Sequence, residues 1–413
     1  MSTLRRLISH QNVSVRLLNF RNVARIDIWL VLIVFTLAVI GWILMYSASR
    51  STSTVYLHRM ICFFLGGLLV SVFFISIDYR FLVNWAPLFY MGSLALLTSV
   101  LLFGTAVKGS ERWINLGVFR LQPSEFSKVI MIFFLTWYLV KVGDRIRKFG
   151  WFFLTFCLVA IPVGLILKQP NLGTAASLIP LTFAMLFAAG CRRIHLTIII
   201  LLGLSLLPVL WWEMKDFDPA VETEKRAVWE LKHYQKKRIY TYLHPDYDHK
   251  DTGWHTYQSR ITIGSGGLSG KGYLRGTQTK LNYLPEHHTD FIFSLLAEEF
   301  GFVGGVTVIA LFAILLFRGL IYARDAYDMQ GTLIAVGVVT VLAFHIFVNI
   351  AITTGLLPVT GIPLPFLSYG GSFYMTVMAG MGMLLCVPLR KKEVEQQNMP
   401  TSIANVEVYR RKG

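Results

Sequence analysis

An aspartate at the edge of an apolar stretch is the first candidate for chemistry in this sequence. Asp290 follows Thr289, which could cap a helix, and precedes the apolar run 291–296. At the outer surface of a membrane, partial desolvation would suit this carboxylate to act as a general base. The alternative is an acid that complements the dipole of a helix N-terminus. Other titratable residues crowd the same edge: Glu286, His287 and His288.

A second candidate is a charged pair at the start of another apolar stretch. Pro123 predicts the first helical turn there, because proline suits the first position of a helix. Glu125 and Lys128 are then i,i+3 neighbours that can pair on one face. An ionisable residue inside a span is by default a functional candidate. The alternative is a first-turn glutamate beside a lysine that reaches toward the interface.

A glycine cluster, residues 264–272, could bind an anion. It departs from a nucleotide-binding P-loop at two positions. Glycines still allow consecutive N–H groups to converge on a phosphate, and Lys271 adds a positive charge beside them. Gly266, Gly267 and Lys271 are therefore candidates for contact with a lipid phosphate. The alternative is a glycine turn with a solvated lysine.

An uncharged segment rich in proline and glycine, residues 355–372, could cover a site. Irregular backbone at membrane depth must be buried in protein or line a cavity. We expect a re-entrant or capping loop near the outer face, and the alternative is an apolar interfacial loop. Before it, His345 and Asn349 are i,i+4 neighbours in an apolar stretch, and we interpret them as interhelical hydrogen-bonding residues.

The composition places these candidates in a membrane protein. The 413 residues are 54% hydrophobic and 15% charged, whereas ordinary soluble domains carry about 25% charge. A spanning helix needs about 20 mostly apolar residues. Such stretches are centred near Phe35, Leu68, Leu96, Phe133, Val159, Leu181, Ile200, Ile309, Leu342 and Gly380. We predict an all-α polytopic membrane protein with about ten transmembrane helices.

Lysine and arginine predict the orientation, because they collect in cytoplasmic loops. They favour cytoplasmic N- and C-termini: a basic segment 1–27, a membrane domain 28–390 and a basic tail 391–413. The net charge of +16 then reflects topology and attraction to anionic membrane lipid. Nucleic-acid binding is excluded, because no folded basic domain is present.

This topology places a large extracytoplasmic loop, residues 213–289, between helices 7 and 8. Its charges nearly cancel, and its first part has the charge pattern of an exposed helix. The four cysteines of the chain lie in or beside apolar stretches without close spacing. We therefore expect neither a disulfide framework nor a zinc site.

Several long motifs occur in a fixed order. They are Tyr46-Ser47-Ala48-Ser49, Ile77-Asp78-Tyr79-Arg80, Arg112-Trp113-Ile114, Gln122-Pro123-Ser124-Glu125, Gln169-Pro170, Gly264 to Gly272, Leu284 to Phe293, Leu296 to Gly301, Leu357 to Pro365 and Ser368-Tyr369-Gly370-Gly371-Ser372. From residue 27 to 390 the chain closely resembles the SEDS family of cell-wall polymerases. The last two motifs look more like its rod-shape branch, RodA, than its division branch, FtsW.

The resemblance implies a ten-helix peptidoglycan glycosyltransferase of the bacterial cytoplasmic (inner) membrane. It would polymerise lipid II, the undecaprenyl-pyrophosphate-linked disaccharide pentapeptide, at the outer face for cell elongation and shape. The family's essential aspartate falls on Asp290, and its helix-four glutamate and lysine fall on Glu125 and Lys128. The matching motifs also make His288 and Ser368 substrate-binding candidates.

Two departures from the family limit what can be transferred. Asn171 stands where the family usually has an acid, so an ionised role there is in doubt. The stretch 215–230 resembles an insertion, and no family role is assigned to it.

Residues and resemblance agree on a reaction. Asp290 would deprotonate the sugar 4-OH of one lipid-linked unit as it attacks the anomeric carbon of a second, from which undecaprenyl pyrophosphate leaves. Candidates to balance the charge of the leaving group are Lys128, Lys271, Arg260 and the glycine backbone. A divalent cation, Mg or Mn, on the pyrophosphate is another. No second catalytic carboxylate is required, because pyrophosphate is already a good leaving group, unlike in glycosidases.

Two other functions use similar features. A lipid II flippase would suit ten helices with intramembrane charge, but transporters often show internal repeats, and none is convincing here. A noncatalytic scaffold of the elongation machinery would leave Asp290 dispensable. The resemblance implies a class B penicillin-binding transpeptidase as partner, with MreC and MreD as further neighbours.

Overall fold

The computed structural model describes residues 26–50, 55–103, 105–107, 110–115, 120–206, 208, 211–212, 233–244, 252–277 and 288–397. Several predictions concern residues outside these ranges. They are most of the N-terminal segment 1–27, the 215–230 insertion, the end of the tail 391–413, and Glu286 and His287.

Long apolar helices make up most of the described chain, which confirms an all-α polytopic membrane protein. Eight described helices are long and apolar enough to cross a membrane. They are α1 (Ile28–Ser49), α2 (Val55–Ser76), α4 (Ala86–Phe103), α5 (Pro123–Val142), α6 (Phe149–Lys168), α13 (Ile292–Asp325), α14 (Met329–Thr353) and α15 (Gly371–Gln397). Two shorter apolar helices are α7 (Leu172–Ala188) and α8 (Arg193–Ser205). Each predicted centre falls inside one of these ten helices.

The remaining elements are short. They comprise α3 (Tyr79–Asn84), the 3-10 helix η3 (Gly143–Arg147), α10 (His233–Leu243), α11 (Thr252–Ser265), β1 (Thr105–Val107), β2 (Ser110–Asn115) and β3 (Arg120–Leu121). The strands form an antiparallel sheet in the order β1-β2-β3 between α4 and α5, which the sequence analysis did not predict. Arg112 of this sheet donates to the carbonyl of Gln169 (3.1 Å), so the sheet is tied to the segment between α6 and α7.

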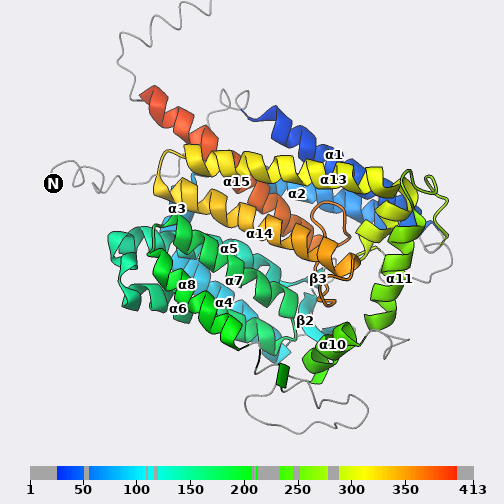
Figure 1. Cartoon of the computed structure of the whole chain (residues 1–413). Coiled ribbons are helices and arrows are strands. Elements are labelled where there is room, and N and C mark those ends of the chain that lie inside the picture. Colours follow the sequence, from blue (N-terminus) through cyan, green and yellow to red (C-terminus); the bar gives the residue numbers. More distant parts are fainter. Residues whose placement is uncertain are drawn as a thin grey trace, which may run out of the picture.

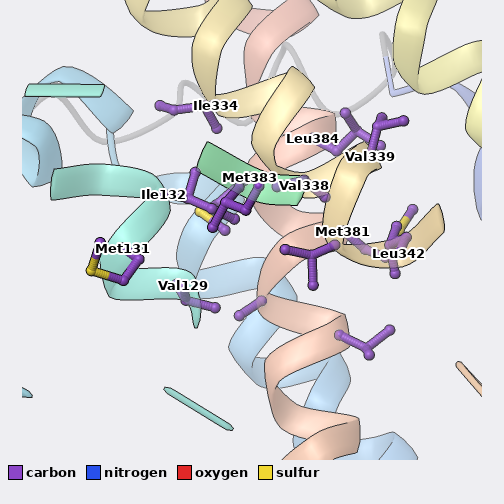
Figure 2. Close-up of a cluster of buried hydrophobic side chains, with 14 of the residues drawn as sticks. Val129, Met131, Ile132, Ile334, Val338, Val339, Leu342, Met381, Met383 and Leu384 are labelled. Atoms are coloured by element: carbon purple, nitrogen blue, oxygen red, sulfur yellow. The ribbon is translucent and has the colours of Figure 1, made fainter. Parts of the chain in front are cut away.

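The long helices run side by side in one bundle, with α10, α11 and the strands gathered at one end (Figure 1). Helix α14 packs against α13, α5, α7 and α15, and α11 packs against α13. The core between α5, α14 and α15 is a close-packed cluster of aliphatic and methionine side chains (Figure 2). On the outside, large apolar side chains are exposed, as a surface against lipid requires: Leu69, Phe103, Leu202 and Phe317 are examples.

A polar clasp joins α1 to α13 at the ends of both helices. The Asp27 carboxylate caps α1 by accepting from Trp29 N (3.0 Å) and Leu30 N (3.3 Å). It also accepts hydrogen bonds from the side chains of Arg318 and Tyr322 of α13. Burial opposes ionisation, but the hydrogen bonds and the Arg318 charge outweigh it, so the pKa of Asp27 lies below its usual value.

Replacing Asp27 should destabilise the protein in a pH-dependent way. Because the pKa of Asp27 is lowered in the folded state, its stabilisation is present above the unfolded-state pKa and is lost as pH falls through the folded-state value. We expect Asp27→Asn to reduce stability by about 1–2 kcal/mol at neutral pH, and the difference to shrink in acid. Thermal unfolding in detergent would measure it. Asp144→Asn, on the exposed side of η3, is the control, and an equal loss there would contradict the clasp.

Candidate active site

Asp290 lies in a turn that precedes α13. The helix begins at Ile292, with Phe291 at its N-cap and no side-chain cap. The prediction that Thr289 caps a helix containing Asp290 is therefore wrong. The reason is visible in the hydrogen bonds, because the carbonyl groups of residues 288–290 accept from groups outside the helix.

Three consecutive carbonyl groups of this turn each accept a hydrogen bond from a distant donor. The pairs are Tyr369 N to His288 O (3.0 Å), Ser368 Oγ to Thr289 O (2.6 Å) and Asn349 Nδ2 to Asp290 O (2.9 Å). Two donors come from the segment 355–372, and the third comes from α14. The backbone that carries the Asp290 carboxylate is thus fixed by two other elements.

The segment 355–372 covers Asp290, as expected of a capping loop. Its residues Ile362, Leu364, Phe366 and Leu367 are buried, and Gly361 has a φ of +71°. A Cβ at Gly361 would lie 3.5 Å from Asp290 Oδ2, so the loop backbone passes beside the carboxylate.

Ser368 positions this loop instead of facing a substrate. Its side chain is fully buried. Its hydroxyl donates to Thr289 O and accepts from Leu364 N (2.8 Å), so its hydrogen bonds are with backbone groups. The structure thereby gives Ser368 a different role from the predicted substrate contact. His288 remains at the edge of the site, with its ring 5.2 Å from that of Tyr56.

The predicted pairing of Glu125 and Lys128 is confirmed. Lys128 Nζ lies 2.8 Å from Glu125 Oε2 and 2.9 Å from His345 Nε2. Lys128 is only 1% exposed, and a charge at that depth requires a paired, hydrogen-bonded partner. Thr174 Oγ1 donates to the other Glu125 oxygen (3.2 Å). Lys128 is therefore held as one member of a buried network.

Asn171 completes this network without a charge. Its Oδ1 accepts from Thr174 N (3.4 Å) at the start of α7, and its Nδ2 donates to Ser124 Oγ (3.0 Å). An amide serves both contacts, because one needs an acceptor and the other a donor. The position where the family usually has an acid thus acts here as a helix cap and a link to α5.

Helix α14 connects the two charged parts of the site. His345 and Asn349 are one turn apart, a rise of about 6 Å. His345 makes the predicted interhelical contact, with Lys128 of α5. Asn349 instead donates to the turn before α13 and to the loop 355–372. Thr353 is one turn further along, and its carbonyl accepts from Ser259 of α11 (2.6 Å). One face of α14 therefore contacts the Glu125–Lys128 pair, the Asp290 turn and the outer helix α11.

A small cavity of about 20 Å³ adjoins Lys128 and His345. Its other lining side chains are mainly apolar and belong to α5, α14 and α15, including Val129, Val338 and Leu342. These three belong to the hydrophobic cluster of the bundle core (Figure 2). The volume suits about one water molecule. The Lys128 charge therefore stands at the boundary between the polar network and the apolar core.

The glycine cluster does not form an anion cradle. Its N–H groups donate to protein carbonyls: Lys271 N to Glu298 O (2.9 Å), Gly272 N to Glu299 O (3.0 Å) and Gly270 N to Gly266 O (2.9 Å). The N–H groups of Gly266 and Gly267 donate to carbonyls of α11. The predicted phosphate contact through these amides is therefore corrected, because the amides are already used.

The cluster instead fills a break in α13 at Gly301, where φ is +67°. Phe302 N and Val303 N, which lack helical partners at the break, donate to Gly267 O (2.9 Å) and Leu268 O (3.1 Å). A Cβ at Gly266 would lie 1.9 Å from Ala297 O. Glycine is needed here for close backbone approach.

Lys271 also belongs to this junction. Its Nζ lies 2.7 Å from Glu298 Oε1, and the Glu298 side chain is fully buried. The neighbouring Glu299 accepts a hydrogen bond from Ser47 of α1. Sequence reasoning missed both glutamates as structural residues. The signal was present, because two adjacent acids interrupt an apolar run.

The structure thus places the predicted site residues in three groups, with Arg260 apart from them. Asp290 and His288 lie in the turn that Ser368 of the loop 355–372 binds. Glu125 and Lys128 of α5 contact α14 at His345, one turn before Asn349. Lys271, Gly266 and Gly267 lie at the break of α13, and Arg260 is exposed on α11, with its side-chain stem against Gly355.

The fold and the site define a polytopic membrane protein with a braced carboxylate at one end of its helix bundle. The family model of FtsW, RodA and SpoVE, described as cell cycle protein, matches residues 28–393. The chain therefore belongs to this family, the SEDS family.

Relatives from both branches are similar over nearly their whole length. Peptidoglycan glycosyltransferase MrdB of Escherichia coli K12 is 34% identical over 90% of this chain and 96% of the relative. The probable peptidoglycan glycosyltransferase FtsW of Trichlorobacter lovleyi is 39% identical over 88% of this chain and 93% of that protein.

Solved structures share the fold. A chain from a peptidoglycan synthase complex, described as coordinating polymerisation and crosslinking, has a TM-score of 0.74 at 30% identity and covers 89% of this chain and 98% of its own. The rod shape determining protein RodA of Thermus thermophilus has a TM-score of 0.63 at 28% identity and covers 88% and 97%.

The glycine junction predicts a sharp contrast between two neighbouring positions. Gly266→Ala should destabilise the chain by about 1–3 kcal/mol, because the new Cβ meets the backbone of α13, which cannot yield easily. Gly264→Ala meets no atom within 4 Å and should be neutral or slightly stabilising. Thermal unfolding and limited proteolysis would compare them. Equal stability of the two variants would contradict the packing.

The buried pair predicts a non-additive result. Lys128→Met leaves the Glu125 carboxylate buried without its cation, which should cost about 3–5 kcal/mol. The double variant Glu125→Gln, Lys128→Met should recover much of that stability, because no buried charge remains. A chemical-denaturation series would test this, and additive losses would show that the pair is not the source of the effect.

Proposed function

We propose that this chain polymerises lipid II into glycan strands with Asp290 as the general base. The chain is a peptidoglycan glycosyltransferase of the SEDS family, a multi-pass protein of the bacterial cytoplasmic membrane. The observation that carries the proposal is the braced turn, in which three backbone carbonyls are fixed while the half-buried carboxylate of Asp290 lies beside Gly361. A rigid, partly desolvated carboxylate suits proton abstraction.

The proposed reaction joins two lipid-linked units. Asp290 takes the proton of the acceptor sugar's 4-OH as its oxygen attacks the anomeric carbon of the donor. The bond from that carbon to the phosphate oxygen breaks, and undecaprenyl pyrophosphate carries away the bonding electrons. One carboxylate is sufficient, because the leaving group does not need protonation by a second acid.

Of the three predicted cations, Arg260 is the preferred candidate to balance the charge of the pyrophosphate. It is exposed on α11. Lys128 and Lys271 each form an ion pair with a glutamate, so their charges are already balanced. Within the described ranges, no three metal-ligating side chains gather. A Mg or Mn ion on the pyrophosphate is a further candidate for this role.

The proposed orientation places the turn 288–291, the loop 213–289 and the capping loop 355–372 at the outer face. Helices α10 and α11 lie at the same end of the bundle as the strands, which supports a common outer surface (Figure 1). The segment 28–390 forms the membrane domain, and both termini are placed in the cytoplasm because basic residues collect in the loops on that side.

We assign the chain to cell elongation, the rod-shape branch, and infer a class B penicillin-binding transpeptidase as its partner. The structural similarity to RodA and to a synthase complex that couples polymerisation with crosslinking supports both. MreC and MreD are further proposed neighbours, from family resemblance. The alternatives are a lipid II flippase and a noncatalytic scaffold, and neither requires Asp290 for polymer formation.

Glycan synthesis from purified lipid II tests the proposal. The chain, reconstituted with its cognate transpeptidase, should form polymer, and Asp290→Asn should lower the rate by about 10²–10⁴-fold. Asp144→Asn removes an exposed acid from η3 and should leave the rate unchanged. Thermal unfolding and co-purification must show that every variant folds and binds the partner.

The flippase and scaffold functions predict different results in the same assay. Undiminished polymer from Asp290→Asn would refute the base assignment. No polymer from any well-folded complex would favour the flippase or the scaffold. Transport of lipid II across liposomes would then separate these two.

A further inference from the structure

We propose that Asn349 is a positioning residue for catalysis, which holds Asp290 and the capping loop in register through one side-chain amide. This inference rests on the proposed function of Asp290. Asn349 contacts the backbone of Asp290, the proposed base, and the backbone of the capping loop.

The hydrogen bonds of Asn349 join two segments that are distant in sequence. Its Nδ2 donates to Asp290 O (2.9 Å) and to Ile362 O (2.7 Å). An amide nitrogen carries two hydrogens, so both are used. One of them fixes the residue that carries the base, and the other fixes the loop beside the carboxylate.

The surroundings of Asn349 make this arrangement costly, which indicates a function beyond packing. The side chain is 0% exposed, and its neighbours along α14 from Ile346 to Val348 and from Ile350 to Ile352 are apolar. Its Oδ1 is buried without a hydrogen-bond partner among the described residues. Burial of an amide with an unmet acceptor opposes folding. An apolar residue would avoid that cost but would provide no donor.

Asn349 also differs from the other donors to the turn. Ser368 and Tyr369 belong to the same loop, so their bonds tie the turn to the loop. Asn349 belongs to α14, and therefore ties both of them to the helix bundle. The orientation of a carboxylate depends on the backbone that carries it, and a displacement of about 1 Å can reduce a rate by about 10²-fold.

The same helix carries the second anchor of the loop. His345, one turn before Asn349, has Nδ1 at 3.4 Å from Pro363 O and Nε2 at 2.9 Å from Lys128 Nζ. The consecutive residues Ile362 and Pro363 are thus held by consecutive turns of α14. This geometry fixes the separation between Asp290 and the Glu125–Lys128 pair.

Three variants test the role of Asn349 in the complex with the transpeptidase. Asn349→Leu has a similar volume and removes both donors. Asn349→Asp restores one donor when its carboxyl group is protonated. Thr340→Val is the matched control on the same helix, because Thr340 Oγ1 donates to Val336 O of its own helix (2.7 Å). The assay measures kcat, KM for lipid II and the thermal-unfolding midpoint.

We expect Asn349→Leu to lower kcat by about 10–100-fold with KM nearly unchanged, because the base is misplaced while substrate contacts remain. Its unfolding midpoint should fall below that of Thr340→Val, because the carbonyls of Asp290 and Ile362 lose their donor, so kcat is measured at a temperature at which both variants are folded. As pH is lowered below neutral, the activity of Asn349→Asp relative to Asn349→Leu should rise, since the protonated acid donates a hydrogen bond. A residue with a merely structural role would not produce that pH response.

Two results would overturn the inference. One is an unchanged kcat in Asn349→Leu while Asp290→Asn is inactive, which leaves the base assignment intact. The other is a parallel loss of kcat, substrate affinity and stability without the pH response of Asn349→Asp. If Asn349→Leu does not fold, the activity of Asn349→Asp relative to the native chain over the same pH range decides between the two roles: a ratio that rises as pH falls supports positioning, and a constant ratio overturns it. Full activity of Asp290→Asn would instead refute the proposed function.

Discussion

The need to satisfy backbone hydrogen bonds at membrane depth organises this structure. The turn before α13 leaves three successive carbonyl groups outside a helix, and each accepts from Asn349, Ser368 or Tyr369. The break at Gly301 poses the same problem, and the glycine turn solves it. There, carbonyl groups before the break accept from residues 271 and 272, and N–H groups after the break donate to residues 267 and 268. At both irregular points of α13, backbone groups that have no helical partner thus form hydrogen bonds with other protein groups instead of with water.

These two junctions explain how a reactive group can be held still at the edge of a membrane. The helical segment from Ile292 to Phe300 is fixed at its start by α14 and the capping loop, and at its end by the glycine turn. The Glu298–Lys271 ion pair and the bond from Ser47 to Glu299 add side-chain contacts at that end. Asp290 thus lies directly before a short segment that is anchored at both ends. Preorganisation of this kind lowers the cost of reaching the transition state.

Sequence patterns predicted what depends on local composition. The apolar stretches, the pairing of Glu125 with Lys128 and the irregular loop 355–372, whose second half is largely buried, follow from hydropathy, helical spacing and proline content. The start of α13, the role of Ser368 and the use of the glycine amides depend on partners tens or hundreds of residues away. The glycine cluster illustrates this, because its amides could equally bind phosphate or a broken helix. The small sheet was missed because its strands are only a few residues long.

The most direct test of the account is a structure of the complex with lipid II bound in the acceptor position, determined by cryo-electron microscopy of the Asp290→Asn variant to prevent turnover. If Asp290 is the base, the acceptor 4-OH will lie within hydrogen-bond reach, about 2.6–3.2 Å, of the side chain at position 290, and the bond from Asn349 to the carbonyl of residue 290 will be intact. An acceptor sugar bound elsewhere, with its 4-OH beyond the reach of this side chain even through one water, would contradict it.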